Sequence, residues 1–210
     1  GSWALILNGF YPRIYNQSPN LKGFYNSYIQ TYLERDVALT RNITDTRAFR
    51  SFLRLLASRA RQLLNMSALA NDVGVIAVTI KEWISVLETS YIVHLVQPYH
   101  KNFNKRISKS PKIYFLDTGL LCFLLNIHNQ DVLSSHPLVG AIFENFIISE
   151  TLKFRWNSGE FGPIYFWREN NGKEIDLIIE NEENTLAIEI KSGKTFSLSY
   201  FNNLKDWLKL

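Results

Sequence analysis

The sequence predicts an α/β protein in which a mainly helical first part is followed by a mixed α/β core. Apolar residues recur at helical spacing through much of residues 21–89, whereas short apolar runs bounded by turn residues occur within 164–190. The charge also changes along the chain: residues 1–112 hold 15 Lys/Arg against 6 Asp/Glu, and residues 113–210 hold 8 against 13. A basic front and an acidic back favour two units, which we place at residues 1–125 and 126–210, with a polar linker near residues 126–137.

The composition limits the class of protein. With 210 residues, 46% of them hydrophobic, the chain has enough apolar material for one large or two small cores. Its single cysteine, Cys122, excludes a disulfide framework and suits a reducing compartment. The first residues lack the basic region and cleavage site of a signal peptide, and no apolar run approaches the roughly 20 residues that span a bilayer, so we expect a cytoplasmic protein that does not enter the membrane. Gly1-Ser2 resembles a tag remnant, so the natural protein is expected to begin earlier.

Three helices are predicted between residues 45 and 89. Asp45 is the expected N-cap of the first. The apolar face of this helix would be Phe49, Phe52, Leu53, Leu56, Leu63 and Leu64, and its polar face Arg47, Arg50, Arg54 and Arg61. Ser67 is expected to cap a short helix that stops at Gly74, before a longer helix near residues 77–89. A short helix, a glycine turn and a longer helix form the helix-turn-helix pattern.

Two predicted strands, at residues 91–96 and 113–116, surround a loop without acidic residues. The basic residues of this loop are Lys101, Lys105, Arg106, Lys109 and Lys112. Such an arrangement is the wing of a winged helix, and the loop is a candidate contact for DNA phosphates. The second helix of the motif offers only Lys81, beside the acidic Glu82, which favours backbone contact over sequence readout. The alternatives are an ordinary solvated surface and a module that docks on another protein.

The second unit combines acidic residues and a lysine in a pattern typical of a metal site. A helix at residues 138–154 precedes predicted strands at 164–167, 175–179 and 186–190. Because side chains alternate along a strand, Asp176 shares a face with Glu174, and Glu189 shares one with Lys191, while the intervening Ile175, Leu177 and Ile190 point into a core.

On neighbouring strands, Asp176 and Glu189 would converge on one Mg²⁺ or Mn²⁺ ion, which would generate a hydroxide nucleophile. Lys191 would place a positive charge beside a scissile phosphate, and Glu144 on the preceding helix would add a carboxylate. The alternative is that these residues are the ordinary charged face of a half-buried sheet.

Several strings of residues resemble a known family. They are Gly9-Phe10-Tyr11-Pro12-Arg13, Tyr32-Leu33-Glu34-Arg35-Asp36, Pro111-Lys112-Ile113-Tyr114-Phe115-Leu116-Asp117-Thr118-Gly119-Leu120, Glu144-Asn145, Tyr165-Phe166-Trp167-Arg168, Glu174-Ile175-Asp176 and Ala187-Ile188-Glu189-Ile190-Lys191-Ser192. Together they resemble the C-terminal half of prokaryotic AAA+-type ATPases, which carries a domain of unknown function. The last strings resemble the restriction-endonuclease-like PD-(D/E)xK core. The resemblance implies that Glu144, Asp176, Glu189 and Lys191 form a nuclease-like site.

The sequence departs from a complete ATPase. No Gly-x-x-x-x-Gly-Lys-Ser/Thr phosphate loop occurs, so an ATP-binding module is expected only upstream of these residues. The chain ends within the helix that usually follows the lysine strand of the nuclease-like fold, which is therefore expected to be truncated at its C-terminus.

Two functions compete. The first is an Mg²⁺- or Mn²⁺-dependent deoxyribonuclease, with DNA, its own upstream ATPase domain and further copies of the chain as partners. The second is a non-catalytic DNA- or protein-binding module that couples the upstream ATPase to a partner. Asp117 is expected to cap the following helix rather than to act in catalysis, and the single cysteine and scattered histidines predict no zinc site.

Overall fold

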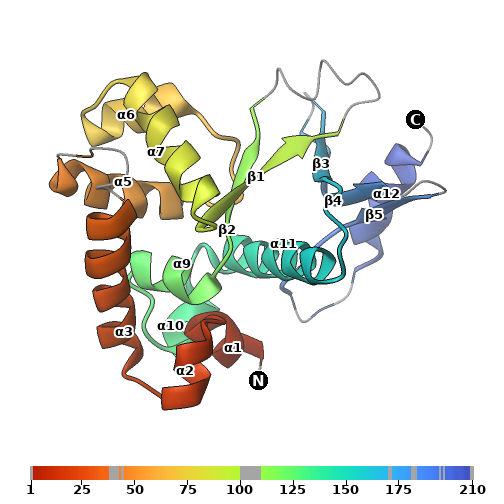
Figure 1. The fold of residues 1–210 in the computed structure, drawn as a ribbon. Coiled ribbons are helices and arrows are strands. Elements are labelled where there is room, and N and C mark those ends of the chain that lie inside the picture. Colours follow the sequence, from red (N-terminus) through yellow and green to blue (C-terminus); the bar gives the residue numbers. More distant parts are fainter. Residues whose placement is uncertain are drawn as a thin grey trace.

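The computed structural model describes residues 2–37, 43, 45–99, 110–169, 172–180, 184–193, 195 and 197–208, and it has the predicted mixed α/β class. Figure 1 shows a group of helices on one side of the molecule and a sheet with two flanking helices on the other. The long helix α11 (Val139–Asn157) runs between these two regions. None of the helices in the described part of the chain combines the length and the apolar character needed to cross a membrane.

The helical region and the sheet have the following bounds. The helices are α1 (Ser2–Asn8), α2 (Pro12–Gln17), α3 (Leu21–Tyr28), α5 (Thr46–Ser58), α6 (Met66–Val73), α7 (Ala77–Thr89), α9 (Thr118–Leu124) and α10 (Gln130–Ser135), and α3 continues as the π-helical segment η1 (Ile29–Val37). The strands are β1 (Val93–Pro98), β2 (Lys112–Phe115), β3 (Ile164–Arg168), β4 (Glu174–Glu180) and β5 (Thr185–Ile188). The 3-10 segment η2 (Leu198–Phe201) leads into α12 (Asn202–Trp207). Helix α10 lies within the stretch that the sequence indicates as a linker.

The predicted succession of α5, α6 and α7 is confirmed, and side-chain caps define where two of these helices begin. Asp45 accepts a hydrogen bond from the first turn of α5 at 2.8 Å, as expected. Asn65, instead of the expected Ser67, caps α6 by accepting a backbone N–H at 2.9 Å, so that helix begins earlier than predicted. Gly74 ends α6 with a φ of 83°, a conformation that glycine adopts without steric cost.

The sheet joins the predicted wing to the predicted nuclease-like core. Its strand order is β2-β1-β3-β4-β5. The antiparallel pair β1–β2 is the predicted wing pair, and it runs from Val93 opposite Phe115 to Val96 opposite Lys112. Strand β1 also pairs in parallel with β3, through Gln97 opposite Tyr165. Because of this pairing the sheet is continuous across the predicted boundary at residues 125 and 126, and the division into two domains stays a prediction.

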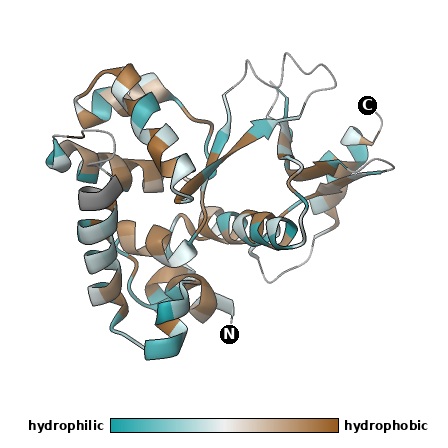
Figure 2. Cartoon of the chain, viewed as in Figure 1, coloured by the Kyte–Doolittle hydropathy of each residue, from teal (hydrophilic) through white to brown (hydrophobic). Residues whose placement is uncertain are grey.

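The sheet packs against a different helix on each face. Ile148 and Leu152 of α11 pack with Phe166 and Leu177 in one hydrophobic cluster. On the other face, Ile175 and Ile178 of β4 and Trp167 of β3 form a second cluster, which Leu204 and Trp207 of α12 cover. A third and larger cluster fills the helical region, and Figure 2 shows hydrophobic colours running along β1 and through α9 toward it.

An irregularity in β4 decides which of its side chains face α11. Tyr165 pairs with Ile178 and Trp167 pairs with Ile175, so β4 has one more residue than β3 over this interval. Such a bulge interrupts the alternation of side chains. The prediction that Ile175 and Leu177 share a face is therefore wrong, because Ile175 packs toward α12 and Leu177 toward α11.

A buried carboxylate connects two of the family-like strings of the first part. Asp117, 6% exposed, caps α9 by accepting from Leu120 N–H at 2.7 Å and also accepts from Phe10 N–H at 2.7 Å. The Tyr25 hydroxyl lies 2.9 Å from Asp117 Oδ1, and a Cβ atom on Gly119 would overlap this hydroxyl. The predicted capping role of Asp117 is confirmed, and the same carboxylate also holds the loop after α1 against α9.

We expect Asp117→Ala to lower the free energy of unfolding by about 2–4 kcal/mol, because it removes a helix cap and leaves buried donors without an acceptor. Urea unfolding followed by circular dichroism measures this loss. The matched control is Asp45→Ala, which removes an exposed N-cap and should cost about 1 kcal/mol. Equal losses in the two variants would contradict the role of Asp117 in joining α1, α3 and α9.

Candidate functional site

The structure brings the four predicted site residues to one end of the sheet. Glu144 lies on α11 and Asp176 on β4, and both side chains are 2% exposed. Strand β5 ends at Ile188, so Glu189 and Lys191 lie just after the strand and not within it as predicted. The buried Ile190 between them anchors this segment in the cluster under α11.

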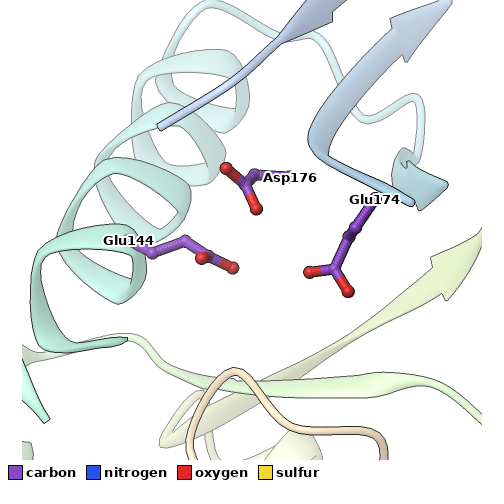
Figure 3. A group of neighbouring side chains, drawn as sticks. All are labelled: Glu144, Glu174 and Asp176. Carbon is purple, nitrogen blue, oxygen red and sulfur yellow. The ribbon is translucent and has the colours of Figure 1, made fainter. Parts of the chain in front are cut away.

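Three carboxylates converge at this place. Carboxylate oxygens of Glu144, Glu174 and Asp176, one from each residue, all lie within 4.8 Å of one another. Figure 3 shows the three side chains pointing toward a common centre, Glu144 from α11 and the other two from β4. The sequence places Glu174 on one strand face with Asp176 but does not mark it as a site residue. The bulge in β4 accommodates Asp176 beside the α11-facing Leu177.

Lys191 links Asp176 to Glu189. Its ammonium nitrogen lies 2.6 Å from Glu189 Oε1 and 3.8 Å from Asp176 Oδ2. Burial works to lower the pKa of Lys191, but the hydrogen bond to Glu189 and the charge of Asp176 together raise it above its usual value. Lys191 therefore carries its positive charge at neutral pH. The backbone N–H of Ile190 also donates to Asp176 Oδ2 at 2.8 Å, which holds the segment after β5 close to β4.

One oxygen at the site has no hydrogen-bond partner among the described residues. Glu189 Oε2 is buried and accepts no hydrogen bond there, while Glu189 Oε1 is bound by Lys191. Burial raises the pKa of Glu189, and the nearby charge of Asp176 adds to this effect. An unsatisfied buried carboxylate oxygen is costly, so its position is one where a cation would be favourable.

Two cations from the first part of the chain enter the site. Lys112, the first residue of β2, is 1% exposed and forms ion pairs with Glu174 and, at 3.5 Å, with Glu144. Arg61 forms an ion pair with Glu144 and lies 3.9 Å from Glu174. Two expectations are thereby wrong: Lys112 is not a solvent-exposed member of the basic loop, and Arg61 is not on the polar face of a helix.

The position of Arg61 follows from how α5 ends. The helix stops at Ser58, and Arg61 then adopts a left-handed φ of 72° while its N–H donates to Ile113 O at 2.8 Å. An arginine in this conformation is uncommon, because its Cβ atom makes it unfavourable. This turn places the guanidinium of Arg61 beside the carboxylates of Glu144 and Glu174 and not on the polar face of α5.

Burial changes the acidity of Glu144. Burial raises the pKa of Glu144 to about 7, although Lys112, Arg61 and the hydroxyl of Tyr114 act to lower it. Tyr114 donates to Glu144 Oε1 at 2.8 Å. Near neutral pH this buried carboxyl therefore exists in both protonation states, a property common among functional carboxylates.

The residues at this site fit a divalent cation. Carboxylate oxygens are the ligands that Mg²⁺ and Mn²⁺ prefer, and three of them already converge within 4.8 Å. The buried and unpartnered Glu189 Oε2 adds a further acceptor nearby. Arg61 and Lys112 bind some of the same oxygens, so a metal ion would share these carboxylates with two protein cations.

Sequence reasoning missed several members of this cluster. They are Arg61, Lys112, Tyr114, Arg168 and Glu174, of which Arg168 lies 3.3 Å from Glu174. The spacing of Glu174 and Asp176 could have revealed Glu174, because it places both on one strand face. Lys112 and Tyr114 lie in the family-like string before Asp117, but no local pattern places them near Glu144.

The predicted DNA contacts are only partly within the described residues. Lys81 lies exposed on α7, next to Glu82, as the sequence predicts. Helix α7 begins after Ile76 without a side-chain cap. Lys101, Lys105, Arg106 and Lys109 lie outside the described residues.

Comparisons with known proteins identify two family segments. Residues 2–131 match a family described as "Domain of unknown function (DUF8612)", and residues 139–210 match "Domain of unknown function (DUF4143)". Uncharacterized proteins of Mycobacterium bovis and Mycobacterium tuberculosis are each 32% identical over 174 residues, which are 83% of this chain and 38% of theirs. The chain thus spans well under half the length of these relatives, and no solved structure gave a significant match. Because the first family model covers more than half of the sequence, the chain belongs to the DUF8612 family, and its C-terminal part matches DUF4143.

Proposed function

We propose that Glu144, Asp176, Glu189 and Lys191 form a divalent-metal-dependent site that cleaves phosphodiester bonds of DNA. The observation that carries this proposal is the convergence of carboxylates from α11 and β4 within 4.8 Å, with the Lys191 ammonium 3.8 Å from Asp176. The resemblance of the strings around Asp176 and Lys191 to a PD-(D/E)xK core supports the same chemistry.

Each residue has a distinct role in this proposal. Asp176 and Glu189 hold the Mg²⁺ or Mn²⁺ ion, and Glu144 from α11 and Glu174 from β4 supply further carboxylates. Such an ion, when bound, supplies an activated water and a positive charge beside the scissile phosphate. Lys191, whose side chain is 37% exposed, contributes a fixed positive charge where the phosphate develops negative charge. Arg61 and Arg168, 41% and 45% exposed, can contact neighbouring phosphates from the rim.

The remaining parts of the proposal concern partners. The first 112 residues carry 15 Lys/Arg against 6 Asp/Glu, which favours association with the phosphate backbone of DNA. The relatives are much longer than this chain, and the family resemblance supports an upstream ATP-binding module that works with this part in the cytoplasm. That module and further copies of the chain are the proposed protein partners.

One observation favours a second function. Lys112 and Arg61 already neutralise Glu144 and Glu174, so the cluster can serve as a structural ion network without a metal. In that case the chain is a non-catalytic DNA- or protein-binding module that couples an upstream ATPase to its target. Cleavage and metal-binding measurements separate the two functions.

We expect Asp176→Asn and Lys191→Ala to lower Mn²⁺-dependent cleavage of plasmid DNA by about 10²–10³-fold, because the first removes a ligand of the metal ion and the second removes a positive charge that stabilises the transition state. Agarose gels of purified protein with Mn²⁺, and with EDTA as the metal-free reference, measure this loss. The matched control is Lys205→Ala, which removes an exposed lysine of α12 and should leave cleavage unchanged. Cleavage that survives both site substitutions would contradict the assigned site.

The affinity for Mn²⁺ should rise as the pH rises through about 7, because burial raises the pKa of Glu144 to about 7 and only its deprotonated form binds a cation well. Below that pH the proton competes with the metal ion. Isothermal titration calorimetry at several pH values between about 6 and 8 measures how the Mn²⁺ affinity depends on pH. Glu144→Gln should remove the rise, whereas Glu82→Gln on α7 should not; an unaltered profile in Glu144→Gln would exclude Glu144 as a ligand.

Binding to duplex DNA should weaken steeply with salt, because the predicted contacts are to phosphates. Replacing Lys101, Lys105, Arg106 and Lys109 by Gln should lower the slope of log K against log[salt] by about one unit for each phosphate interaction removed. Fluorescence anisotropy over a range of KCl concentrations measures the slope. Lys81→Gln tests separately whether Lys81 on α7 contacts a phosphate. DNA binding that is insensitive to salt would argue against DNA as the partner.

A further inference from the structure

A cavity of about 490 Å³ opens where α7 ends and β1 begins. Its walls include Glu88, Tyr91, His94, Trp156 and Phe161. It is separate from the carboxylate cluster: Glu144 and Trp156 are twelve positions apart on α11, which is about 18 Å along a helix. Along β2 the two sites also lie at opposite ends, with Lys112 at the carboxylates and Leu116, just after the strand, at the cavity.

Tyr91 has an unusual backbone conformation at the rim of this cavity. Its φ is 54°, in the left-handed region. The N–H of Ile92 donates to Leu87 O at 2.9 Å and the N–H of Tyr91 donates to Glu88 O at 3.0 Å, which is the pattern of a Schellman motif at the end of α7. Glycine usually occupies this position, because a side chain makes the conformation unfavourable. Tyr91 instead places a ring there that is 71% exposed.

The exposed ring belongs to an aromatic wall. Tyr91 and Trp156 meet edge to face, with ring centroids 6.0 Å apart. The ring of His94 contacts Trp156 in the same manner at 5.6 Å. Phe161 lines the cavity with a side chain that is 77% exposed. Tyr91, Trp156 and Phe161 thus supply three aromatic rings to the walls of one cavity.

A carboxylate completes the lining. Glu88 is half-buried, burial raises its pKa above the usual value, and among the described residues it has no cationic partner. No lysine or arginine of the described chain lines this cavity. Burial lowers the pKa of His94, so its ring is neutral near pH 7 and adds no positive charge. The cavity is therefore lined by three aromatic rings and one carboxylate.

We propose that this cavity binds an arginine side chain of a partner protein. A guanidinium group is attracted to the faces of aromatic rings, and its planar set of donors matches a carboxylate. Tyr91, Trp156 and Phe161 supply the rings, and Glu88 supplies the carboxylate. The left-handed Tyr91 is then explained, because a glycine at this position would leave the cavity without one of its walls.

The negative charge of Glu88 favours an arginine side chain over a nucleobase as the occupant of the cavity. Proteins that stack bases on aromatic side chains also place lysine or arginine beside them to hold the backbone phosphates. Here the charged group on the wall is an acid, which would repel a phosphate. The cavity and the carboxylate cluster are thus expected to take partners of opposite charge.

The binding of N-acetyl-arginine amide tests this proposal with the intact chain. We expect the indole N–H signal of Trp156 in a ¹H–¹⁵N spectrum to shift, with a Kd on the order of 1–10 mM for so small a probe. N-acetyl-citrulline amide has nearly the same shape but no charge, and it should bind about tenfold more weakly. Equal shifts with both probes, or no shift with the arginine probe at about 0.1 M, would overturn the proposal.

Substitutions of the cavity-lining residues test whether the arginine probe binds in this cavity. Tyr91→Gly suits the left-handed backbone, so it should keep or raise thermal stability while it weakens arginine binding about tenfold. Glu88→Gln should weaken binding by a similar factor. Phe154→Ala removes an exposed ring of α11 outside the cavity and should change nothing. Arginine binding that persists in both Tyr91→Gly and Glu88→Gln, or stronger perturbation of the same signals by a single-stranded oligonucleotide, would refute this assignment.

Discussion

The pairing of Lys112 with Glu144 is the interaction on which the arrangement of the rest of the molecule depends. Both residues are at most 2% exposed, and transferring a single unpaired charge into such a place costs several kcal/mol. Each residue therefore requires partners of opposite charge, and these come from separate segments: Lys112 from β2 also pairs with Glu174, and Glu144 from α11 also pairs with Arg61. Arg61, Glu174 and Tyr114 complete the network, so the end of α5, the wing pair and β4 are held around one set of charges.

The ion-pair network and the strand pairing of the sheet hold the same segments of the chain together. Strand β1 pairs with β2 on one side and with β3 on the other, which brings Lys112 into the neighbourhood of β4. The bulge between β3 and β4 then turns Asp176 toward α11 beside Leu177. Without the parallel pairing of β1 and β3, the wing would have no fixed relation to the acidic residues. The charged cluster is thus a property of the whole chain and not of its last third alone.

The same scaffold separates two chemically different places. At one end of β2, carboxylates are surrounded by the cations Arg61, Lys112, Arg168 and Lys191. Beyond the other end, the aromatic cavity carries a carboxylate and, in the described chain, no lysine or arginine. Helix α11 contributes to both, with Glu144 in one and Trp156 in the other. Their separation follows from the rigidity of a 19-residue helix packed along the sheet.

Much of the local structure was determined by the sequence alone. The α/β class, the order of α5, α6 and α7, the capping by Asp45 and Asp117, and the wing pair followed from periodicity and turn chemistry, which act between neighbours in the chain. The pattern around Asp176 and Lys191 indicated residues that lie at the same end of the sheet as Glu144, although it did not indicate the cations that pair with Glu144.

Only the tertiary structure decided the composition of the site. Lys112 was expected in a solvated loop and Arg61 on a helix face, yet both are drawn to the carboxylates, because buried charges must find partners irrespective of their separation in sequence. The early end of α5, the left-handed Arg61 and the bulge in β4 all depend on contacts between distant segments. The aromatic cavity has the same origin, since Glu88 and Trp156 are brought together only when α7 and α11 pack against the ends of β1 and β2.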